Sequence, residues 1–396
     1  MVNVSSSNGL EKRPRLAFRN IDGSRFPCWR QTSLGCIIEP YSEKVYGEHD
    51  YEVLTSAREG LQRQVDHFGS KQRHDTDGYN IIPFGYCTYR NRSDDGKFAF
   101  NINTISEKAI VSKFYPVFRF TNANSTFMAE FLNSSPRVKK KLSVLAVGTS
   151  QVVLSFEALK AAKFDLPCKD EQDKIAAFFE CLNTRIENQR TLVAALKKYK
   201  RGLLSAVFSQ NVSMFSTADF YDFSELAVRR SEKYDPKCNA HAVCIELEHI
   251  EQETGRIIGS TCADYQNSIK TVCKPGDVMF GKLRPYLRKY AFVQKECVCS
   301  SEIWSLIPTD IVIPKYLFYL IQSEAFIKAA NVSSGTKMPR AEWSTIAKSG
   351  YPIPSKDDQQ ATVDILETTD RIIVSHVASY DRLIEYKKGL LQRLFI

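Results

Sequence analysis

Two short segments of the sequence place cationic and amide side chains among aromatic and turn residues. Residues 89–97 read Tyr-Arg-Asn-Arg-Ser-Asp-Asp-Gly-Lys, and residues 282–290 read Lys-Leu-Arg-Pro-Tyr-Leu-Arg-Lys-Tyr. Arg and Lys bind phosphates and guanine edges, and Asn can bind adenine edges, so both segments could contact DNA. A solvated surface loop is the alternative interpretation of each segment. The candidate contacts are Arg90, Asn91, Arg92 and Lys97 in the first segment, and Lys282, Arg284, Arg288 and Lys289 in the second.

No sequence motif for catalysis accompanies these segments. The chain has no glycine-rich dinucleotide or phosphate-binding loop, no His-Glu-x-x-His motif and no Gly-x-Ser-x-Gly motif. It also lacks the Asn-Pro-Pro-Tyr tetrapeptide with which amino-methyltransferases hold a flipped base. Cys297 and Cys299 form a Cys-x-Cys pair without a second pair at zinc-ligand spacing. These absences predict a binding protein without catalytic residues, a cofactor site or a metal site of its own.

The composition is that of a folded, moderately basic protein. Of 396 residues, 43% are hydrophobic and 25% are charged, and 54 basic against 45 acidic residues give a net charge of +9. The length allows roughly two to four domains, and the positive excess suits a polyanionic partner without proving one. The 11 cysteines are irregularly spaced, and we find neither a secretory signal nor a long apolar run, so we expect a cytoplasmic protein.

The chain contains an internal repeat with an offset of 187 residues. Residues 166–172 (Leu-Pro-Cys-Lys-Asp-Glu-Gln) align with residues 353–359 (Ile-Pro-Ser-Lys-Asp-Asp-Gln), and residues 199–204 (Tyr-Lys-Arg-Gly-Leu-Leu) align with residues 386–391 (Tyr-Lys-Lys-Gly-Leu-Leu). The same offset relates Gly148-Thr149 to Gly335-Thr336, and Phe208 to Phe395. In the Gly-Thr segments, Lys337 and Arg340 are further candidates, here for contacts with the DNA backbone.

Each copy of the repeat ends in about 40 residues with a heptad pattern. In the first copy Ile175, Leu182, Gln189, Leu196 and Leu203 recur every seven residues, interleaved with Phe179, Ile186, Val193, Lys200 and Val207. Residues 170–208 predict a helix of about 58 Å at about 1.5 Å per residue, which begins shortly after Pro167. We expect the two helices to pair antiparallel. The alternative is that each packs only on its own globular half.

Polar residues interrupt the expected helix interface. Gln189 and His376 occupy equivalent heptad positions, where a residue that sets the helix register or is solvated is favoured over a metal ligand. Phe178 and Ile365 are also equivalent and apolar. The interior of the coiled coil is their expected place, and a docking site for a partner protein is the alternative.

The segments before each helix have another pattern, approximately over residues 14–165 and 216–352. Short β-branched and aromatic runs alternate with Gly, Pro, Asn and Asp, which is typical of short strands and turns. One apolar helical patch precedes each Gly-Thr pair, around Phe127 in the first half and Leu317 in the second. Both globular halves are therefore predicted to be α+β.

With these features the chain resembles the specificity subunit of a type I restriction-modification system. The resemblance rests on Leu/Ile-Pro-x-x-[Asp/Glu]-x-Gln at the helix start and Lys-[Arg/Lys]-Gly-Leu-Leu-x-x-x-Phe at its end, each present twice, and it covers nearly the whole chain. It implies two globular target recognition domains, at residues 1–165 and 216–354. It also implies two long spacer helices, within residues 166–215 and 355–396, that form an antiparallel coiled coil.

The resemblance further implies a function. Each target recognition domain would read one half of a split DNA site, while the helices set the distance between the half-sites. The implied partners are double-stranded DNA, two methyltransferase subunits that use S-adenosylmethionine to methylate adenine, and restriction subunits that use ATP with Mg²⁺. The chain itself would be a non-catalytic, DNA-associated subunit in the prokaryotic cytoplasm. A coiled-coil scaffold that binds protein and reads no DNA sequence is the alternative function.

Overall fold

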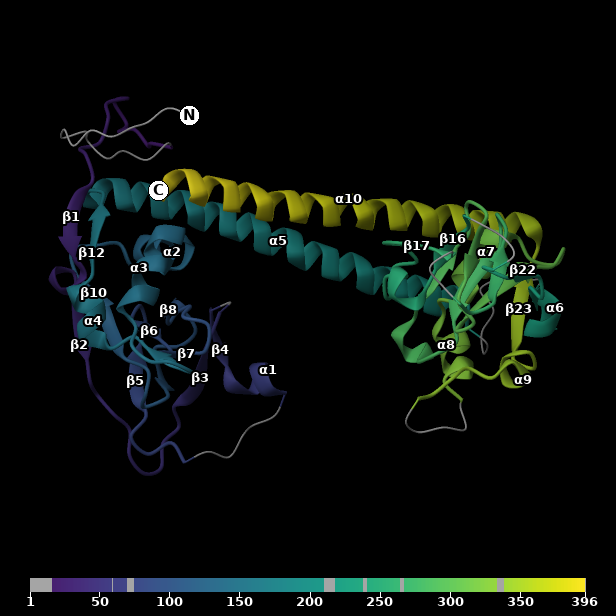
Figure 1. The fold of residues 1–396 in the computed structure, drawn as a ribbon, viewed down its shortest axis with the longest axis horizontal. Coiled ribbons are helices and arrows are strands. Elements are labelled where there is room, and N and C mark those ends of the chain that lie inside the picture. Colours follow the sequence, from purple (N-terminus) through teal and green to yellow (C-terminus); the bar gives the residue numbers. More distant parts are fainter. Residues whose placement is uncertain are drawn as a thin grey trace. The chain divides into compact units, whose positions relative to one another are not determined.

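The structure, a computed structural model, describes residues 16–58, 60–69, 75–209, 218–237, 241–263, 267–332 and 338–395. Lys337, one of the candidate DNA contacts, therefore lies outside the described residues. The chain divides into two compact units: unit 1 comprises Met1–Asn188 with Tyr380–Ile396, and unit 2 comprises Gln189–Ser379. Each unit consists of a globular part and segments of two long helices, α5 (Lys169–Val207) and α10 (Lys356–Leu394) (Figure 1).

In the described residues, the globular part of unit 1 is built from short strands, four α-helices and a 3₁₀ turn at Leu34–Cys36. Two four-stranded sheets, in the orders β2-β10-β6-β8 and β4-β3-β9-β5, lie beside the two-stranded pairs β1-β12 and β7-β11. The strands are β1 (Arg30–Ser33), β2 (Ile38–Tyr41), β3 (Glu52–Ala57), β4 (Gly60–Arg63), β5 (Asn80–Pro83), β6 (Cys87–Tyr89), β7 (Arg92–Ser93), β8 (Phe100–Ile102), β9 (Lys108–Val111), β10 (Val117–Phe120), β11 (Val152–Val153) and β12 (Lys163–Leu166). The helices are α1 (Gln64–Phe68), α2 (Ser125–Ser134), α3 (Pro136–Leu145) and α4 (Phe156–Ala161).

Unit 2 has the same kind of architecture. Its described sheets run in the orders β14-β22-β19-β20 and β15-β18-β21-β16-β17, and β13 pairs with β23. The strands are β13 (Ala218–Asp222), β14 (Ala227–Arg229), β15 (Lys233–Tyr234), β16 (Val243–Ile245), β17 (Thr261–Cys262), β18 (Lys270–Cys273), β19 (Val278–Gly281), β20 (Tyr290–Phe292), β21 (Cys297–Cys299), β22 (Ile303–Pro308) and β23 (Gly350–Pro354). The helices are α6 (Phe223–Leu226), α7 (Pro314–Leu320), α8 (Glu324–Ala330) and α9 (Trp343–Ile346), with 3₁₀ turns at Leu247–His249 and Pro285–Leu287.

The heptad pattern of the sequence corresponds to the buried side of both long helices. Each helix has 39 residues, and the first begins one residue earlier than expected. At the ends of α5 its heptad residues Ile175, Phe179 and Lys200 are buried, whereas in the middle they are only partly buried. This gradient is expected because a two-helix pair by itself covers only a narrow stripe of each helix.

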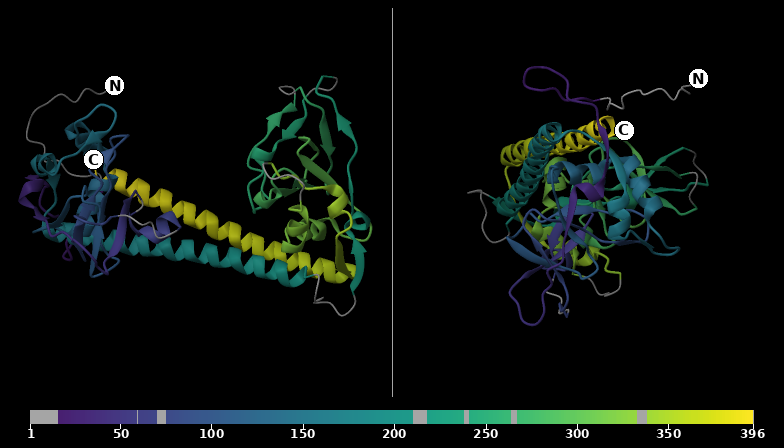
Figure 2. Two further views of the ribbon diagram at one scale, coloured as in Figure 1. Left: turned by 90° about the horizontal axis from the view of Figure 1, so that it is seen from below. Right: turned by 90° about the vertical axis from the view of Figure 1, so that its left-hand side faces the viewer.

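In both units the end of one long helix lies beside the start of the other (Figures 1 and 2). Phe395, just beyond α10, packs in the core of unit 1, with its ring 5.2 Å from that of Phe131. The equivalent Phe208, just beyond α5, packs in the core of unit 2, 5.1 Å from the ring of Tyr316. The repeated terminal Phe is thus an anchor for the helix end, and the predicted α+β fold with paired long helices is confirmed.

The repeated Gln of the helix-start motif has a buried structural role in each unit. Gln172 accepts a hydrogen bond from the backbone N–H of Asn124 at 2.9 Å and donates one to the Pro167 carbonyl at 2.9 Å. Gln359 accepts one from the N–H of Ile313 at 2.9 Å. In each case Oε1 accepts a hydrogen bond from a backbone N–H at the N-terminus of a globular helix, α2 or α7. Such an N–H has no acceptor within its own helix. The motif therefore fixes each globular helix to the start of a long helix.

Candidate nucleic-acid interface

The two cationic segments of the sequence occupy equivalent places in the two units. In unit 1 the segment follows β6, and Arg92 pairs with Val153 of β11. In unit 2 it follows β19, and Leu283 forms a β-bridge with Arg340. Val153 and Arg340 are themselves equivalent, since they are 187 residues apart. The fold therefore brings each cationic loop together with the segment after the Gly-Thr pair, which the sequence had indicated only as separate candidates.

One backbone hydrogen bond fixes this equivalence further. The N–H of Leu154 donates to the Asn91 carbonyl at 2.9 Å, and the N–H of Ala341 donates to the Lys282 carbonyl at 2.8 Å. Leu154 and Ala341 are again 187 residues apart. Asn91 and Lys282 thus hold the same structural position, although the sequence around them shows no detectable similarity.

Gly148 makes the tight turn of the unit 1 hairpin possible. Its φ is +141°, and a Cβ at this position would lie 2.3 Å from the carbonyl oxygen of Gln151. Val147 and Val153 close the hairpin through two backbone hydrogen bonds of 3.0 and 2.9 Å. Only glycine is accommodated here without a backbone shift, which gives the glycine of the Gly-Thr pair a steric explanation.

In unit 1 the arginines of the loop are exposed and lie close to aromatic side chains. The Arg92 guanidinium lies 5.0 Å from the ring centroid of Phe114, which is itself 50% exposed. Burial raises the pKa of Tyr115, and the charge of nearby Arg90 opposes this rise. Sequence reasoning missed Phe114 because it lies on a different loop, and only the fold places it beside Arg92. The Lys113 ammonium lies 5.8 Å from the centroid of the same ring. An exposed ring with two such cations beside it can stack on a base or on a sugar while the cations contact phosphate.

The remaining unit 1 candidates are more constrained. The Lys97 ammonium lies 3.3 Å from Asp95, which also pairs with Arg58 at 2.7 Å. The pKa of Asp95 is lowered to about 2, mainly by a hydrogen bond from the Ser93 hydroxyl. Asn91 is half-buried, and its Oδ1 is buried with no hydrogen-bond partner among the described residues. A buried amide oxygen without a donor is unusual.

In unit 2 two of the candidate cations have no side-chain partner in the described part of the chain, and two others are engaged. Lys282 and Arg284 make no side-chain hydrogen bond or ion pair with a described residue. Arg284 is exposed and has a φ of +52°, a conformation that is costly for a residue with a Cβ and is found mostly at functional loops. Arg288 donates to both carboxylate oxygens of Glu324 at 2.7 Å, and Lys289 donates to the Leu247 carbonyl at 2.6 Å.

Arg340 lies between these two groups. It is exposed, yet its guanidinium pairs with Glu302 at 3.1 and 3.3 Å. An exposed pair of this kind contributes little to stability, because solvent screens it. A DNA phosphate could therefore replace Glu302 as the partner of Arg340 at small cost.

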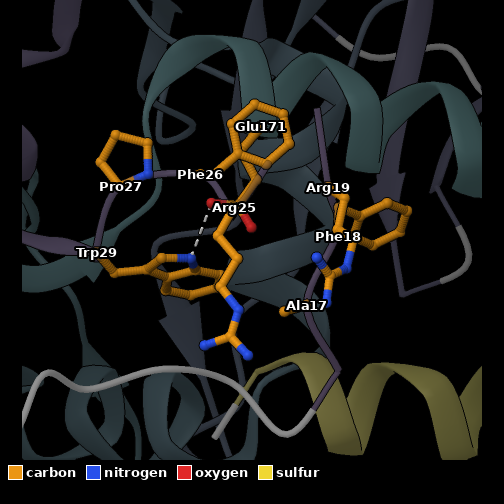
Figure 3. A pocket seen from close by; sticks show the side chains of 8 residues that line it. All are labelled: Ala17, Phe18, Arg19, Arg25, Phe26, Pro27, Trp29 and Glu171. Atoms are coloured by element: carbon orange, nitrogen blue, oxygen red, sulfur yellow. Dashed lines mark hydrogen bonds between the residues drawn. The ribbon is translucent and has the colours of Figure 1, made fainter. Parts of the chain in front are cut away.

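A separate hollow of about 240 Å³ lies in unit 1 beside the start of α5. Figure 3 shows its lining, in which the Trp29 indole donates to the Glu171 carboxylate at 3.2 Å. The lining residues are Ala17, Phe18, Arg19, Arg25, Phe26, Pro27, Trp29 and Glu171. The hollow includes none of the candidate DNA contacts. Its carboxylate helps to fix the N-terminal segment on the helix.

Comparison with known proteins assigns these paired units to a family. The family described as type I restriction modification DNA specificity domain matches residues 40–198 and again residues 229–383. The chain belongs to this family. Each match contains one of the two cationic loops and most of one long helix, so the family expected from the repeated motifs is confirmed.

Individual members of the family are only distantly similar to the chain. It is 28% identical over 145 residues to the HindI specificity subunit of Haemophilus influenzae (35% of this chain, 31% of that protein). It is 22% identical over 260 residues to the MjaVIII specificity subunit of Methanocaldococcus jannaschii (59% of this chain, 61% of that protein). The matches thus span about one third to three fifths of the length of these curated relatives.

A solved structure shares the fold. The type I restriction-modification S subunit from M. genitalium superposes with a TM-score of 0.58 at 14% identity, covering 97% of this chain and 99% of that one. Within the described part of this family member, no cluster of three or more His, Cys, Asp or Glu residues is suited to holding a metal ion. Among the same residues, no helix is both long and apolar enough to cross a lipid bilayer.

Proposed function

We propose that this chain is the non-catalytic, DNA-reading specificity subunit of a type I restriction-modification complex. It directs adenine methylation and restriction by partner subunits to a bipartite DNA target. Residues 1–165 and 216–354 are the two target recognition domains, and residues 166–215 and 355–396 contain the spacer helices. The domain limits follow the repeat, since each helix start motif closes the globular segment before it.

The observation that carries this proposal is the equivalent placement of two different cationic loops on two copies of one domain. Each loop follows the same strand of its domain and pairs with the segment after the Gly-Thr pair. The loops differ in sequence, with Asn91 in one at the position of Lys282 in the other. Two copies of one domain that carry different polar side chains at the same structural position are suited to reading two different half-sites.

The exposed faces of the long helices support two copies of one protein partner. Phe178 and Ile365 are 36% and 57% exposed, so the expectation that they lie in the coiled-coil interior is wrong. Tyr199 and Tyr386, also equivalent to each other, are 59% and 57% exposed. Because large apolar groups are exposed at repeat-equivalent positions, the same partner surface can bind twice, as two methyltransferase subunits would.

A glycine in each helix adds to this argument. Gly202 and Gly389 lie within helices, where glycine costs about 1 kcal/mol relative to alanine. No atom outside the local helix lies within 4 Å of a Cβ built at either position. The packing of this chain therefore does not require these glycines. Each is three residues after an exposed tyrosine, Tyr199 or Tyr386, on the same helix face, where it leaves room for the backbone of a partner.

The remaining components of the reaction belong to partners in this proposal. The methyltransferase subunits bind S-adenosylmethionine, and the restriction subunits bind ATP with Mg²⁺. The chain supplies the positions of two DNA readers. Each helix of 39 residues is about 58 Å long at about 1.5 Å per residue, which is the scale of a spacing between DNA half-sites.

The direct test is to map N6-methyladenine in DNA from cells that carry this chain with its methyltransferase partner, and again after deletion of this chain. We expect a split motif that disappears on deletion. If the partner is active and no methylated motif depends on this chain, the proposed function is wrong.

Paired arginine variants assign the half-sites to the domains. Arg92→Ala and Arg284→Ala should each weaken recognition of a different half-site, and each variant serves as the control for the other. The loss of one bidentate base contact is about 1–3 kcal/mol, or about 5- to 150-fold in affinity. An equal loss at both half-sites in either variant would contradict the assignment.

Salt dependence distinguishes a DNA reader from a protein scaffold. The affinity of the complex for DNA should fall steeply between 50 and 200 mM salt, because each neutralised phosphate releases counterions. A scaffold that touches no DNA would leave the salt dependence of the methyltransferase unchanged when the chain is added.

A further inference from the structure

A lysine of the helix-end motif lies at the centre of a polar cluster in unit 2. Lys200 on α5 is 8% exposed, and its ammonium pairs with Asp370 on α10 at 2.7 Å. It also donates to Oε1 of Gln322, two residues after the end of α7, at 3.0 Å. The Tyr319 hydroxyl of α7 donates to the other oxygen of Asp370 at 2.9 Å. We call these four residues the Lys200 cluster; it joins both long helices to the globular part of unit 2.

Unit 1 contains a corresponding group, the Lys387 cluster, formed by Lys387, Glu130 and Asn183. Lys387 on α10 pairs with Glu130 on α2 at 2.7 Å, with side-chain exposures of 23% and 17%. Asn183 on α5 donates to the same carboxylate oxygen at 3.4 Å. This cluster also joins both long helices to the globular part of its unit.

The members of the two clusters occupy equivalent positions. Lys387 is equivalent to Lys200, and Asn183 to Asp370, by the offset of 187. On the globular side, Glu130 of α2 is equivalent to Tyr319 of α7. This follows because the N–H groups accepted by the two motif glutamines belong to residues 124 and 313, which are 189 positions apart, as are residues 130 and 319.

The acidic group has therefore changed sides between the two units. In unit 1 the carboxylate is on the globular part, at Glu130, and the long helix contributes the neutral Asn183. In unit 2 the carboxylate is on the long helix, at Asp370, and the globular part contributes the neutral Tyr319. Each cluster contains one lysine and one carboxylate, so each of the two clusters has no net charge.

Exchange of the globular parts between the helix ends would break this neutrality in both places. The unit 1 globular part would bring Glu130 against Asp370, giving two carboxylates and one lysine. The unit 2 globular part would bring Tyr319 beside Asn183 and leave Lys387 without a carboxylate. A partly buried charge without its partner is strongly unfavourable.

We propose that the two clusters make each target recognition domain complementary in charge to the helix ends on which it docks, with Lys200 and Lys387 as positioning residues. The chain itself also holds each domain at its end, since β12 ends at Leu166 just before α5 and β23 ends at Pro354 just before α10. The clusters add charge specificity to this covalent link, because a globular part placed at the other end of the helix pair would leave both clusters with a net charge. Docking of a globular part on the helix ends depends on the charges of these two clusters and does not require DNA.

The first test moves the carboxylate of the Lys387 cluster in the full-length chain. Glu130→Gln removes the only carboxylate and should lower the unfolding midpoint of unit 1 by about 4 °C or more. Asn183→Asp adds a second carboxylate and should also lower it. The double variant Glu130→Gln/Asn183→Asp keeps one carboxylate on the long helix, as in unit 2, and should recover most of the loss. If the double variant is as unstable as the sum of the two single variants, the proposal is wrong.

The second test uses one pair of substitutions in two backgrounds. Asn183→Asp with Asp370→Asn should destabilise the natural chain, because both clusters become charged. The same pair should stabilise a chain in which residues 1–165 and 216–354 have been exchanged, because both clusters become neutral again. A purely structural role for these residues predicts destabilisation in both backgrounds, and that result would overturn the proposal. Thermal unfolding measures both outcomes without DNA, so they are independent of the proposed function.

Discussion

The motif glutamine that begins the second long helix offers the sharpest test of how the globular parts are held. Gln359 is 1% exposed, and its side chain makes three hydrogen bonds. Its Oε1 accepts from Ile313 at 2.9 Å, and its Nε2 donates to the Ile311 and Pro354 carbonyls at 3.1 and 3.0 Å. Gln359→Ala removes all three and leaves these backbone groups without their partners. A buried group left unsatisfied costs about 1–3 kcal/mol.

The expected loss for Gln359→Ala is about 2–4 kcal/mol, since water can reach part of this site in the variant. For a unit of 150–250 residues this corresponds to a decrease of about 4–16 °C in the unfolding midpoint of unit 2. Differential scanning calorimetry of the full chain measures it. Hydrogen exchange adds a local reading, because the amide of Ile313 loses its acceptor and should exchange faster.

Two controls are available in the same chain. Gln360 is exposed, and among the described residues its side chain forms a hydrogen bond only with Asp364 of its own helix, at 2.8 Å. Gln360→Ala should therefore change stability by less than about 0.5 kcal/mol. Gln172→Ala removes two bonds and should destabilise unit 1, by less than Gln359→Ala destabilises unit 2. The reasoning is refuted if Gln359→Ala is no more destabilising than Gln360→Ala.

Further predictions concern single sites. Gly148→Ala should destabilise the unit 1 hairpin, since φ is +141°, and calorimetry measures this loss. Gly202→Ala should stabilise the isolated chain by about 1 kcal/mol and weaken assembly with the proposed methyltransferase partner, as measured by calorimetry and co-purification. Phe395→Ala should cost about 3–5 kcal/mol in unit 1, because its ring is 2% exposed; a loss below 1 kcal/mol would exclude its role as an anchor. Because the pKa of Asp95 is lowered to about 2, its ionised carboxylate stabilises the folded loop at pH values above the usual carboxyl pKa. This contribution is lost as the pH falls toward 2. Ser93→Ala should raise this pKa, as measured by NMR titration, and an unchanged value would contradict the assignment.

The sequence predicted the long helices well because their signal is periodic and local. A seven-residue pattern identifies the buried face without knowledge of the partner, and Pro167 and Pro354 mark the starts within two residues. For Gln189 the sequence leaves open a residue that sets the register and a solvated residue, and its Nε2 donates to the His376 carbonyl at 2.9 Å. The pattern did not predict the exposure of Phe178, since an apolar residue beside the heptad positions can face either the partner helix or solvent.

The candidate interface was predictable in part. Composition located the two cationic loops, and the repeat located the Gly-Thr segments as separate candidates. The sequence could not show that Arg288 donates to Glu324 and Lys289 to a backbone carbonyl, because these contacts depend on the fold. For the same reason Phe114 was missed, although it lies beside Arg92.

The antiparallel arrangement of the helices rests on evidence that a sequence repeat cannot supply. In a parallel pair the ends of both helices would lie in the same globular unit. The structure instead places Phe395 in the core of unit 1 and Phe208 in the core of unit 2. Each unit therefore receives the start of one helix and the end of the other, so each globular part packs against helix segments from both copies of the repeat. For this reason a charge introduced at Asn183 must be balanced by a change at Glu130, because Glu130 pairs with Lys387 of the second copy. A sequence comparison within one copy cannot detect that dependence.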